Sequence, residues 1–265
     1  ATAGMPGSSP DVLYVSGGDG TTFAPTPKKE TYDPRPSMAE MNGATEKYSS
    51  LFGEEWSSRT ATAIHDAFHL KSAFDTLDLT QNWDGSSISD KFASAAKVMM
   101  AHEVRGTDRD VIFLESGGWD HHANMKPRLA EGFVDLNRAL ESFYLEMDAQ
   151  GLWNNVTIVL TSDFGRTLTV NSQSGSDHAW AGHYFVAGGS VKGGNVLGQY
   201  PDDLSEDGPY NIGRGRIMPT TSWDTVWNSV VQWLGVTESA ELDYCLPNRH
   251  SGGSQLFEEN DVFDS

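Results

Sequence analysis

Apolar residues return every three or four positions over long stretches of the chain. This spacing, typical of amphipathic helices, runs through residues 38–80, 88–104, 128–149 and 223–234. Ser222 stands where the last of these helices needs a capping side chain. The helix over 128–149 is predicted to bury one apolar face. That face comprises Leu129, Phe133, Leu136, Leu140, Phe143 and Met147.

Three short segments are instead apolar at every position. They are Val111–Leu114, Val156–Leu160 and Tyr184–Ala187, and each has the length of a strand. Continuous apolar runs are typical of strands that are covered on both faces, as in parallel sheets. Because these runs alternate with helical segments, the order predicts an α/β fold with layers around a mostly parallel sheet.

The pattern changes at both ends of this region. Residues 1–37 are rich in Gly, Pro, Ser and Thr and predict an extended N-terminal segment, with Val12–Val15 as a single short strand. Residues 38–236 predict the α/β domain, and residues 237–265 an acidic, irregular, peripheral C-terminal tail. The chain starts at Ala1 without a basic and then apolar leader, so we expect a removed targeting segment or a longer precursor.

Composition narrows the range of partners. The 265 residues include 37 Asp and Glu against 18 Lys and Arg, a formal net charge of −19. Such a surface repels phosphate backbones and anionic lipids, so we expect no nucleic-acid partner. No stretch approaches the roughly 20 apolar residues of a membrane span, and none is predicted. Cys245 is the single cysteine, which excludes an intrachain disulfide.

Residues of metal-binding type collect beside the three apolar runs. Asp120 and His122 follow the first run, Asp163 follows the second, and His178 and His183 precede the third. The carboxyl ends of strands are the usual ligand sites of open α/β sheets. His183 joins the others only if its strand runs antiparallel or its loop folds over. The donor types predict a divalent metal, with zinc, manganese, iron and calcium all left open.

Two further residues are candidates for catalysis. Arg166 lies close behind Asp163, and its planar guanidinium is suited to holding the oxygens of a phosphoryl or sulfuryl group. Thr21, after the Gly17–Gly20 turn, is the candidate nucleophile. Asp and His next to Gly also occur as plain turn and cap residues. Three such clusters beside three strands favour a metal or anion site over that simpler interpretation.

Four ordered segments resemble one protein family. Their sequences are GGWDHH at 117–122, TSDFGRT at 161–167, DHAWAGHYFVAGG at 177–189 and GRGRIMPTTS at 213–222. They are similar to the exported bacterial family known as domain of unknown function 1501, over about residues 88–236. That family is related to the alkaline-phosphatase and sulfatase superfamily. The resemblance therefore implies a three-layer, alkaline-phosphatase-like α/β sandwich with a metal site at one edge of a mostly parallel sheet.

The resemblance also implies roles for individual residues. Asp120 and His122 match one metal-binding pair, and Asp163 matches the Asp of the superfamily's Asp-His motif. Phe164 stands where that motif has its His, so a complete second metal site is not expected. Either His178 or His183 matches the late histidine of the site.

Two functions follow as hypotheses. The first is an exported metal-dependent hydrolase of phosphate or sulfate esters, secreted or at the cell surface, and periplasmic in a bacterium. The second is a non-catalytic extracellular assembly or matrix protein that reuses the fold, which the charge and the uncertain nucleophile favour. A phosphatase-like sheet takes strands from early in the chain, and here these are missing or shortened, so we expect self-association or binding to the remaining part of a longer precursor. The partner should bury apolar surface from residues 1–60, which are too rich in Gly and Pro to fold alone.

Overall fold

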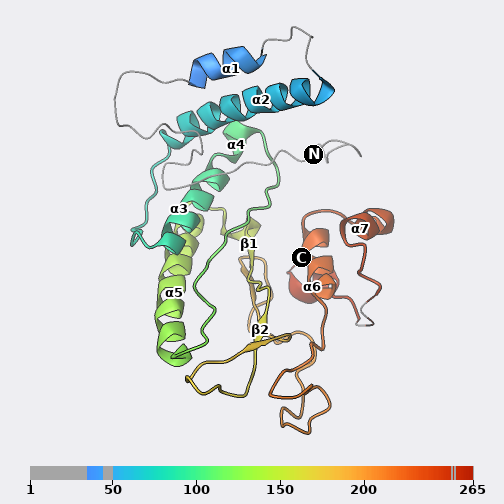
Figure 1. Ribbon diagram of the computed structural model, residues 1–265. Helices are drawn as coiled ribbons and strands as arrows, with labels where there is room; N and C mark the ends of the chain where they lie inside the picture. Colours follow the sequence, from blue (N-terminus) through green and yellow to red (C-terminus); the bar gives the residue numbers. More distant parts are fainter. Residues whose placement is uncertain (1–34, 44–49, 252, 254, 265) are drawn as a thin grey trace. The chain divides into compact units, whose positions relative to one another are not determined.

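The computed structural model describes residues 35–43, 50–251, 253 and 255–264 (Figure 1). The strand expected at Val12–Val15 and the candidate nucleophile Thr21 lie outside these residues. The chain divides into two compact units. The first comprises Ala1–Leu114 and Asp135–Glu146, and the second Glu115–Val134 and Met147–Ser265.

The first unit is helical, as the three- to four-residue spacing predicts. Its helices are α1 (Arg35–Gly43), α2 (Leu51–Phe74), α3 (Ser87–Met100), α4 (His102–Arg105) and the middle of α5 (Met125–Ala149). The predicted helix over 88–104 is divided at Ala101 into α3 and α4. The Ser86 hydroxyl caps α3 by accepting a hydrogen bond from the Ser89 backbone N–H at 3.4 Å.

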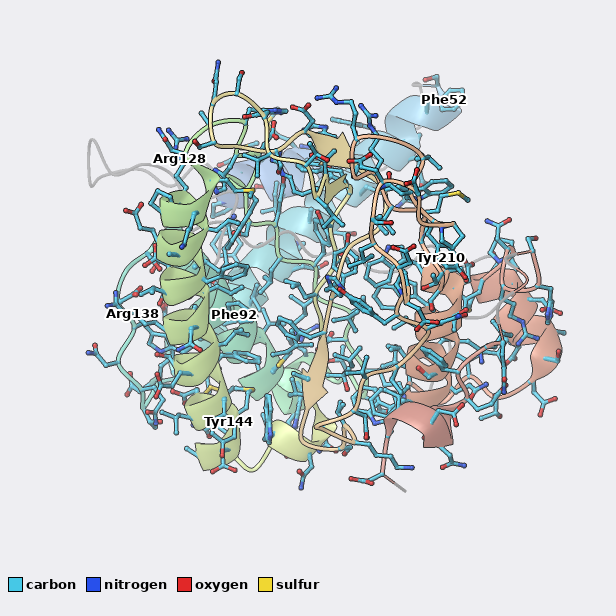
Figure 2. The ribbon with its side chains drawn as sticks, turned by 90° about the horizontal axis from the view of Figure 1, so that it is seen from below. Phe52, Phe92, Arg128, Arg138, Tyr144 and Tyr210 are labelled. Atoms are coloured by element: carbon cyan, nitrogen blue, oxygen red, sulfur yellow. The ribbon has the colours of Figure 1, made fainter. Side chains whose placement is uncertain are left out.

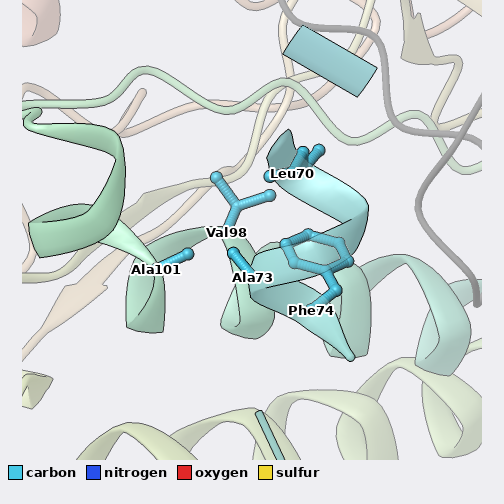
Figure 3. Close-up of a cluster of buried hydrophobic side chains, with 5 residues drawn as sticks. All are labelled: Leu70, Ala73, Phe74, Val98 and Ala101. Carbon is cyan, nitrogen blue, oxygen red and sulfur yellow. The ribbon is translucent and has the colours of Figure 1, made fainter. Parts of the chain in front are cut away.

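The core of the first unit lies where α2 meets α3. Leu70, Ala73 and Phe74 of α2 pack against Val98 and Ala101 (Figure 3). A second contact joins α3 to α5, where the Phe92 and Phe143 rings lie 5.1 Å apart between centroids. Figure 2 shows Phe92 on one side of α5 and Arg138 on the other. Apolar burial between helices thus organises this unit.

Helix α5 confirms the predicted helix over 128–149, but its buried face differs in part. Phe143 and Met147 are buried, as expected. Ala139 and Glu146 complete the buried strip, whereas Phe133 is 54% exposed. The prediction that Phe133 is buried is therefore wrong; its ring lies against Trp119, at 5.3 Å between centroids, and its other side remains open to solvent.

The second unit adds short strands, so the chain is a mixed helix and sheet protein. Strands β1 (Thr157–Val159) and β4 (Val186–Gly188) pair antiparallel, as do β2 (Gly165–Arg166) and β3 (His178–Ala179). The described residues contain these two two-stranded sheets and no large parallel sheet. A three-layer alkaline-phosphatase-like sandwich is likewise not evident among them.

The connection between β1 and β4, residues 160–185, is all described and contains the β2–β3 pair but no helix. A parallel pair is usually joined by a crossover helix. Here the chain leaves β1, forms the β2–β3 pair and returns to β4, so it folds back on itself. The first apolar run, Val111–Leu114, forms no strand, and Val111 and Phe113 are 87% and 84% exposed. An apolar run therefore indicated strand character correctly at β1 and β4 but not at 111–114.

The second unit ends in three helices, α6 (Trp223–Trp233), α7 (Ser239–Cys245) and α8 (Glu259–Val262). Ser222 caps α6 as predicted, by accepting a hydrogen bond from the Thr225 N–H at 3.3 Å.

The C-terminal tail is partly ordered and partly buried. Val262 and Phe263 are each 1% exposed and pack in a cluster with Val230 of α6. The acidic side chains of Glu241 and Asp243 remain exposed, as expected. The expectation of a wholly irregular, peripheral tail is therefore wrong for its apolar residues. None of the helices within the described ranges has the length and apolar character needed to cross a membrane.

Candidate metal centre

The second unit brings Asp120, His122 and His178 together. One carboxylate oxygen and one nitrogen from each ring all lie within 4.8 Å of one another. Asp120 Oδ1 lies 3.1 Å from His122 Nε2 and 2.8 Å from His178 Nε2. The cluster joins segments 58 residues apart in the sequence, and the β2–β3 pair places the second of them.

His121 anchors the segment that carries Asp120 and His122, two of the three candidate metal ligands. Its side chain is buried, with 7% exposure, while Asp120 and His122 on either side are exposed. Burial, together with the positive charges of Arg128 and Arg166, lowers the pKa of His121, so this ring stays neutral more readily than a free histidine. A buried middle residue thus directs both neighbouring side chains outward.

Arg166 fixes the position of Asp120. Its Nη2 donates to Asp120 Oδ1 at 2.6 Å and to the Trp119 carbonyl at 3.1 Å. Its Nη1 donates to the Ser176 carbonyl at 2.7 Å. Arg166 also stands opposite His178 in the β2–β3 register. These hydrogen bonds connect both segments of the cluster.

Phe164 packs against the ring of His178, one of the three candidate metal ligands. Its ring stacks on His178 with centroids 4.1 Å apart and an interplanar angle of 12°. The Arg166 Cζ lies 4.9 Å from the Phe164 centroid. Where the family resemblance places a histidine, the chain thus has an apolar ring that packs against a donor.

The carboxylates of this region are held in their ionised form. The pKa of Asp120 lies below its usual value, mainly because His178 hydrogen-bonds to it, with further contributions from Arg166 and His122. The pKa of Asp177 is lowered as well, first by the Asn171 amide and then by Arg214. An ionised carboxylate is the form that binds a cation.

The other predicted site residues lie outside this cluster. Asp163 is exposed and is not among the three clustered donors. Its negative charge, added to the effect of burial, raises the pKa of Tyr184. His183 stacks on Tyr200, with centroids 5.2 Å apart. The structure therefore assembles three of the five metal-ligand candidates.

Comparison with known proteins supports the family resemblance. The family model described as "Protein of unknown function (DUF1501)" matches residues 14–212, about three-quarters of the 265-residue chain. The chain belongs to the DUF1501 family. The three clustered donors fall within the match, whereas the resembling segment 213–222 lies just beyond it. No curated protein and no solved structure matches the chain.

The donor set of this DUF1501 protein suits a transition metal. Tetrahedral zinc with bonds of about 2.0–2.1 Å separates its ligands by roughly 3.4 Å, so the observed 2.8 and 3.1 Å need only a small expansion. Calcium prefers oxygen ligands, whereas two of these three donors are imidazole nitrogens. Zinc, manganese and iron therefore fit better than calcium.

One neighbour of the cluster was missed in the sequence. The Asp177 carboxylate lies 3.5 Å from His122 Nδ1, the nitrogen that faces away from Asp120. The available signal was its position directly before His178. Because it reaches back to His122 rather than to its own neighbour, the sequence alone did not identify it.

Proposed function

We propose that this DUF1501 protein is a metal-dependent hydrolase of phosphate or sulfate esters. The observation that carries the proposal is the convergence of Asp120, His122 and His178 within 4.8 Å. Two imidazoles and a carboxylate form a three-ligand set, which leaves a position open, as in catalytic rather than structural zinc sites. All three side chains are exposed, so a small anionic ester can reach them.

Arg166 and Phe164 would have different roles beside the metal ligands at this site. A bound divalent metal supplies Lewis-acid chemistry at a phosphoryl or sulfuryl oxygen. Arg166 holds Asp120 toward the two rings, and its charge favours the approach of an anion. Phe164 covers one face of the His178 ring, and the His178 side chain stays half exposed for a substrate. The proposal of a phosphate or sulfate ester as substrate rests on the family resemblance and on Arg166. The proposal of a bound metal rests on the geometry of the three clustered side chains.

Several wider predictions accompany this proposal. Kinship with the alkaline-phosphatase and sulfatase superfamily, and its three-layer sandwich, follow from the resemblance alone. The same resemblance supports export to the periplasm, the cell surface or the medium. Self-association, or binding to the rest of a longer precursor, stays a prediction that light scattering can test.

One observation favours the non-catalytic alternative, an extracellular assembly or matrix protein. Asp120 Oδ1 lies within 3.1 Å of Arg166 Nη2 and of both imidazoles, so the cluster is satisfied by its own charges. In that case Arg166 neutralises Asp120 permanently and no ion displaces it. The net charge of −19 also suits a protein that works outside the cell.

Hydrolysis assays separate the two functions. The purified protein is loaded with zinc, manganese or iron and tested on p-nitrophenyl phosphate and p-nitrophenyl sulfate. The hydrolase proposal expects turnover that is lost in Asp120→Asn and His178→Ala. Asp163→Asn, which removes an exposed carboxylate outside the cluster, is the matched control and should retain activity. Metal binding without turnover of either ester would contradict the hydrolase. If the protein binds none of these metals and turns over neither ester, the non-catalytic alternative is supported.

A further inference from the structure

We infer that Asp177 is a positioning residue that holds the His122 ring so that Nε2, and not Nδ1, is the metal-binding nitrogen. This inference rests on the metal site of the proposed function. It assigns a role to a residue that is not itself one of the three donors.

The His122 ring lies between two carboxylates. Its Nε2 is 3.1 Å from Asp120 Oδ1, within the donor cluster, and its Nδ1 is 3.5 Å from Asp177 Oδ1. A histidine that ligates a metal through one nitrogen usually directs the N–H of the other to a carboxylate or carbonyl. Asp177 occupies the place of that second partner, which orients the ring and fixes its tautomer.

The two oxygens of Asp177 have different partners. Oδ2 accepts a hydrogen bond from Arg214 Nη2 at 2.7 Å, and Oδ1 faces His122. Its main chain is held separately, because its N–H donates to Thr167 Oγ1 and its carbonyl accepts from the Thr167 N–H. Substitution of the side chain therefore removes the contacts to Arg214 and His122 but preserves the backbone pairing.

Arg214 reaches Asp177 from a strained turn. Gly213, Arg214 and Gly215 have φ angles of 96°, 58° and 67°, three consecutive residues in a conformation that disfavours an arginine. The turn is held because the Arg214 N–H donates to Glu206 Oε2 at 3.1 Å. Gly215 is packed so closely that an added Cβ would lie 2.7 Å from the Thr169 nitrogen.

Backbone strain of this kind persists only where surrounding contacts enforce it, and it is common at functional sites. This turn positions the Arg214 guanidinium so that it binds Oδ2 of Asp177, while Oδ1 faces His122. The Gly213–Arg216 sequence, which carried part of the family resemblance, thereby acquires a role: it secures the residue that orients a metal ligand.

Zinc affinity, measured by competition with a chromophoric chelator, tests the assignment. Loss of an outer partner typically weakens metal binding by about 10–100-fold, and we expect this for Asp177→Ala. Asp177→Asn should lose less, because the amide keeps the size of the side chain and an oxygen that can face His122 Nδ1. Asp163→Ala, which removes an exposed carboxylate outside the cluster, should bind zinc as the wild type does. Equal affinities in wild type and Asp177→Ala would overturn the inference.

A second measurement is independent of the metal. In crystal structures of the metal-free proteins, we expect the His122 ring to leave Asp120 in Asp177→Ala and to stay in place in Asp177→Asn. An unmoved ring in Asp177→Ala would contradict the positioning role even if zinc binding fell. If the wild type binds no zinc but the ring moves, the metal proposal fails and the assignment of Asp177 to His122 stands.

Discussion

The helical core of the first unit and the cluster of Asp120, His122 and His178 in the second are ordered by different interactions. In the core, Phe74 of α2 packs against α3, and the helices themselves are built from local backbone hydrogen bonds. In the cluster, Arg166 and His178 reach Asp120 across 46 and 58 residues of sequence. Local periodicity specifies the first kind of order, whereas the second depends on side chains that meet only after the chain has folded.

The two regions should also differ in what a substitution costs. Buried apolar side chains contribute to stability through their surface and packing. Exposed charged groups contribute little to stability because water screens them, although they can determine binding. Substitutions in the core should therefore change the free energy of unfolding, and those at the cluster should change metal affinity.

The largest loss of stability is expected from Phe143→Ala. Phe143 is 2% exposed and packs against Phe92. Removal of such a ring costs about 3–5 kcal/mol, measured by urea unfolding. Phe143→Leu, which preserves more of the volume, should cost less. Equal stability of Phe143→Ala and wild type would show that α5 does not pack on α3 as described.

Glu146→Ala should rank next. Glu146 is fully buried, and its Oε2 accepts hydrogen bonds from the backbone N–H groups of Thr80 and Gln81 at 2.7 and 2.9 Å. Its removal leaves these donors without that partner, at a cost of about 3 kcal/mol. Glu141→Ala, an exposed position on the same helix, is the control and should stay within about 0.5 kcal/mol of wild type.

Phe133→Ala should have a modest effect. The ring is half exposed and contacts Trp119, so the expected loss is about 1 kcal/mol by the same unfolding assay. A loss of about 3–5 kcal/mol, typical of a fully buried ring, would restore the original interpretation of the helix face.

The smallest effect concerns acid stability at Asp243. Arg249 and His250 contact this carboxylate and lower its pKa from the ordinary 3.8, with the Arg249 hydrogen bond contributing most. A lowered pKa stabilises the folded state above pH 3.8, and this contribution is lost as the pH falls through the folded value. Urea midpoints of wild type should therefore fall in that range more than those of Asp243→Asn. Parallel pH profiles would contradict the expectation.

The sequence predicted the features that depend on local signals, namely helices with a repeating apolar spacing and individual residues of metal-binding type. Helical spacing identified α2, α3, α5 and α6, and residue type singled out Asp120, His122 and His178, which the structure brings together as a candidate metal site. These signals are local, because spacing and residue type are visible without the fold.

The remaining features depend on contacts distant in sequence. The continuous apolar runs favoured a parallel sheet, but they do not show where the chain turns back, and β1 and β4 pair antiparallel. Asp163 and His178 are both of metal-binding type, yet of these two residues it is His178 that hydrogen-bonds to Asp120. The role of Asp177 depends on Arg214, 37 residues further along the chain.

Metal stoichiometry tests the central claim most directly. The wild type, Asp120→Asn and the control Asp163→Asn are stripped of metal and titrated with zinc in a calorimeter. The account predicts one tightly bound ion per chain in the wild type and in Asp163→Asn, and a loss of that binding in Asp120→Asn, because Asp120 lies between both imidazoles. Equal binding in wild type and Asp120→Asn, or binding that is lost in Asp163→Asn instead, would contradict a metal centre at Asp120, His122 and His178.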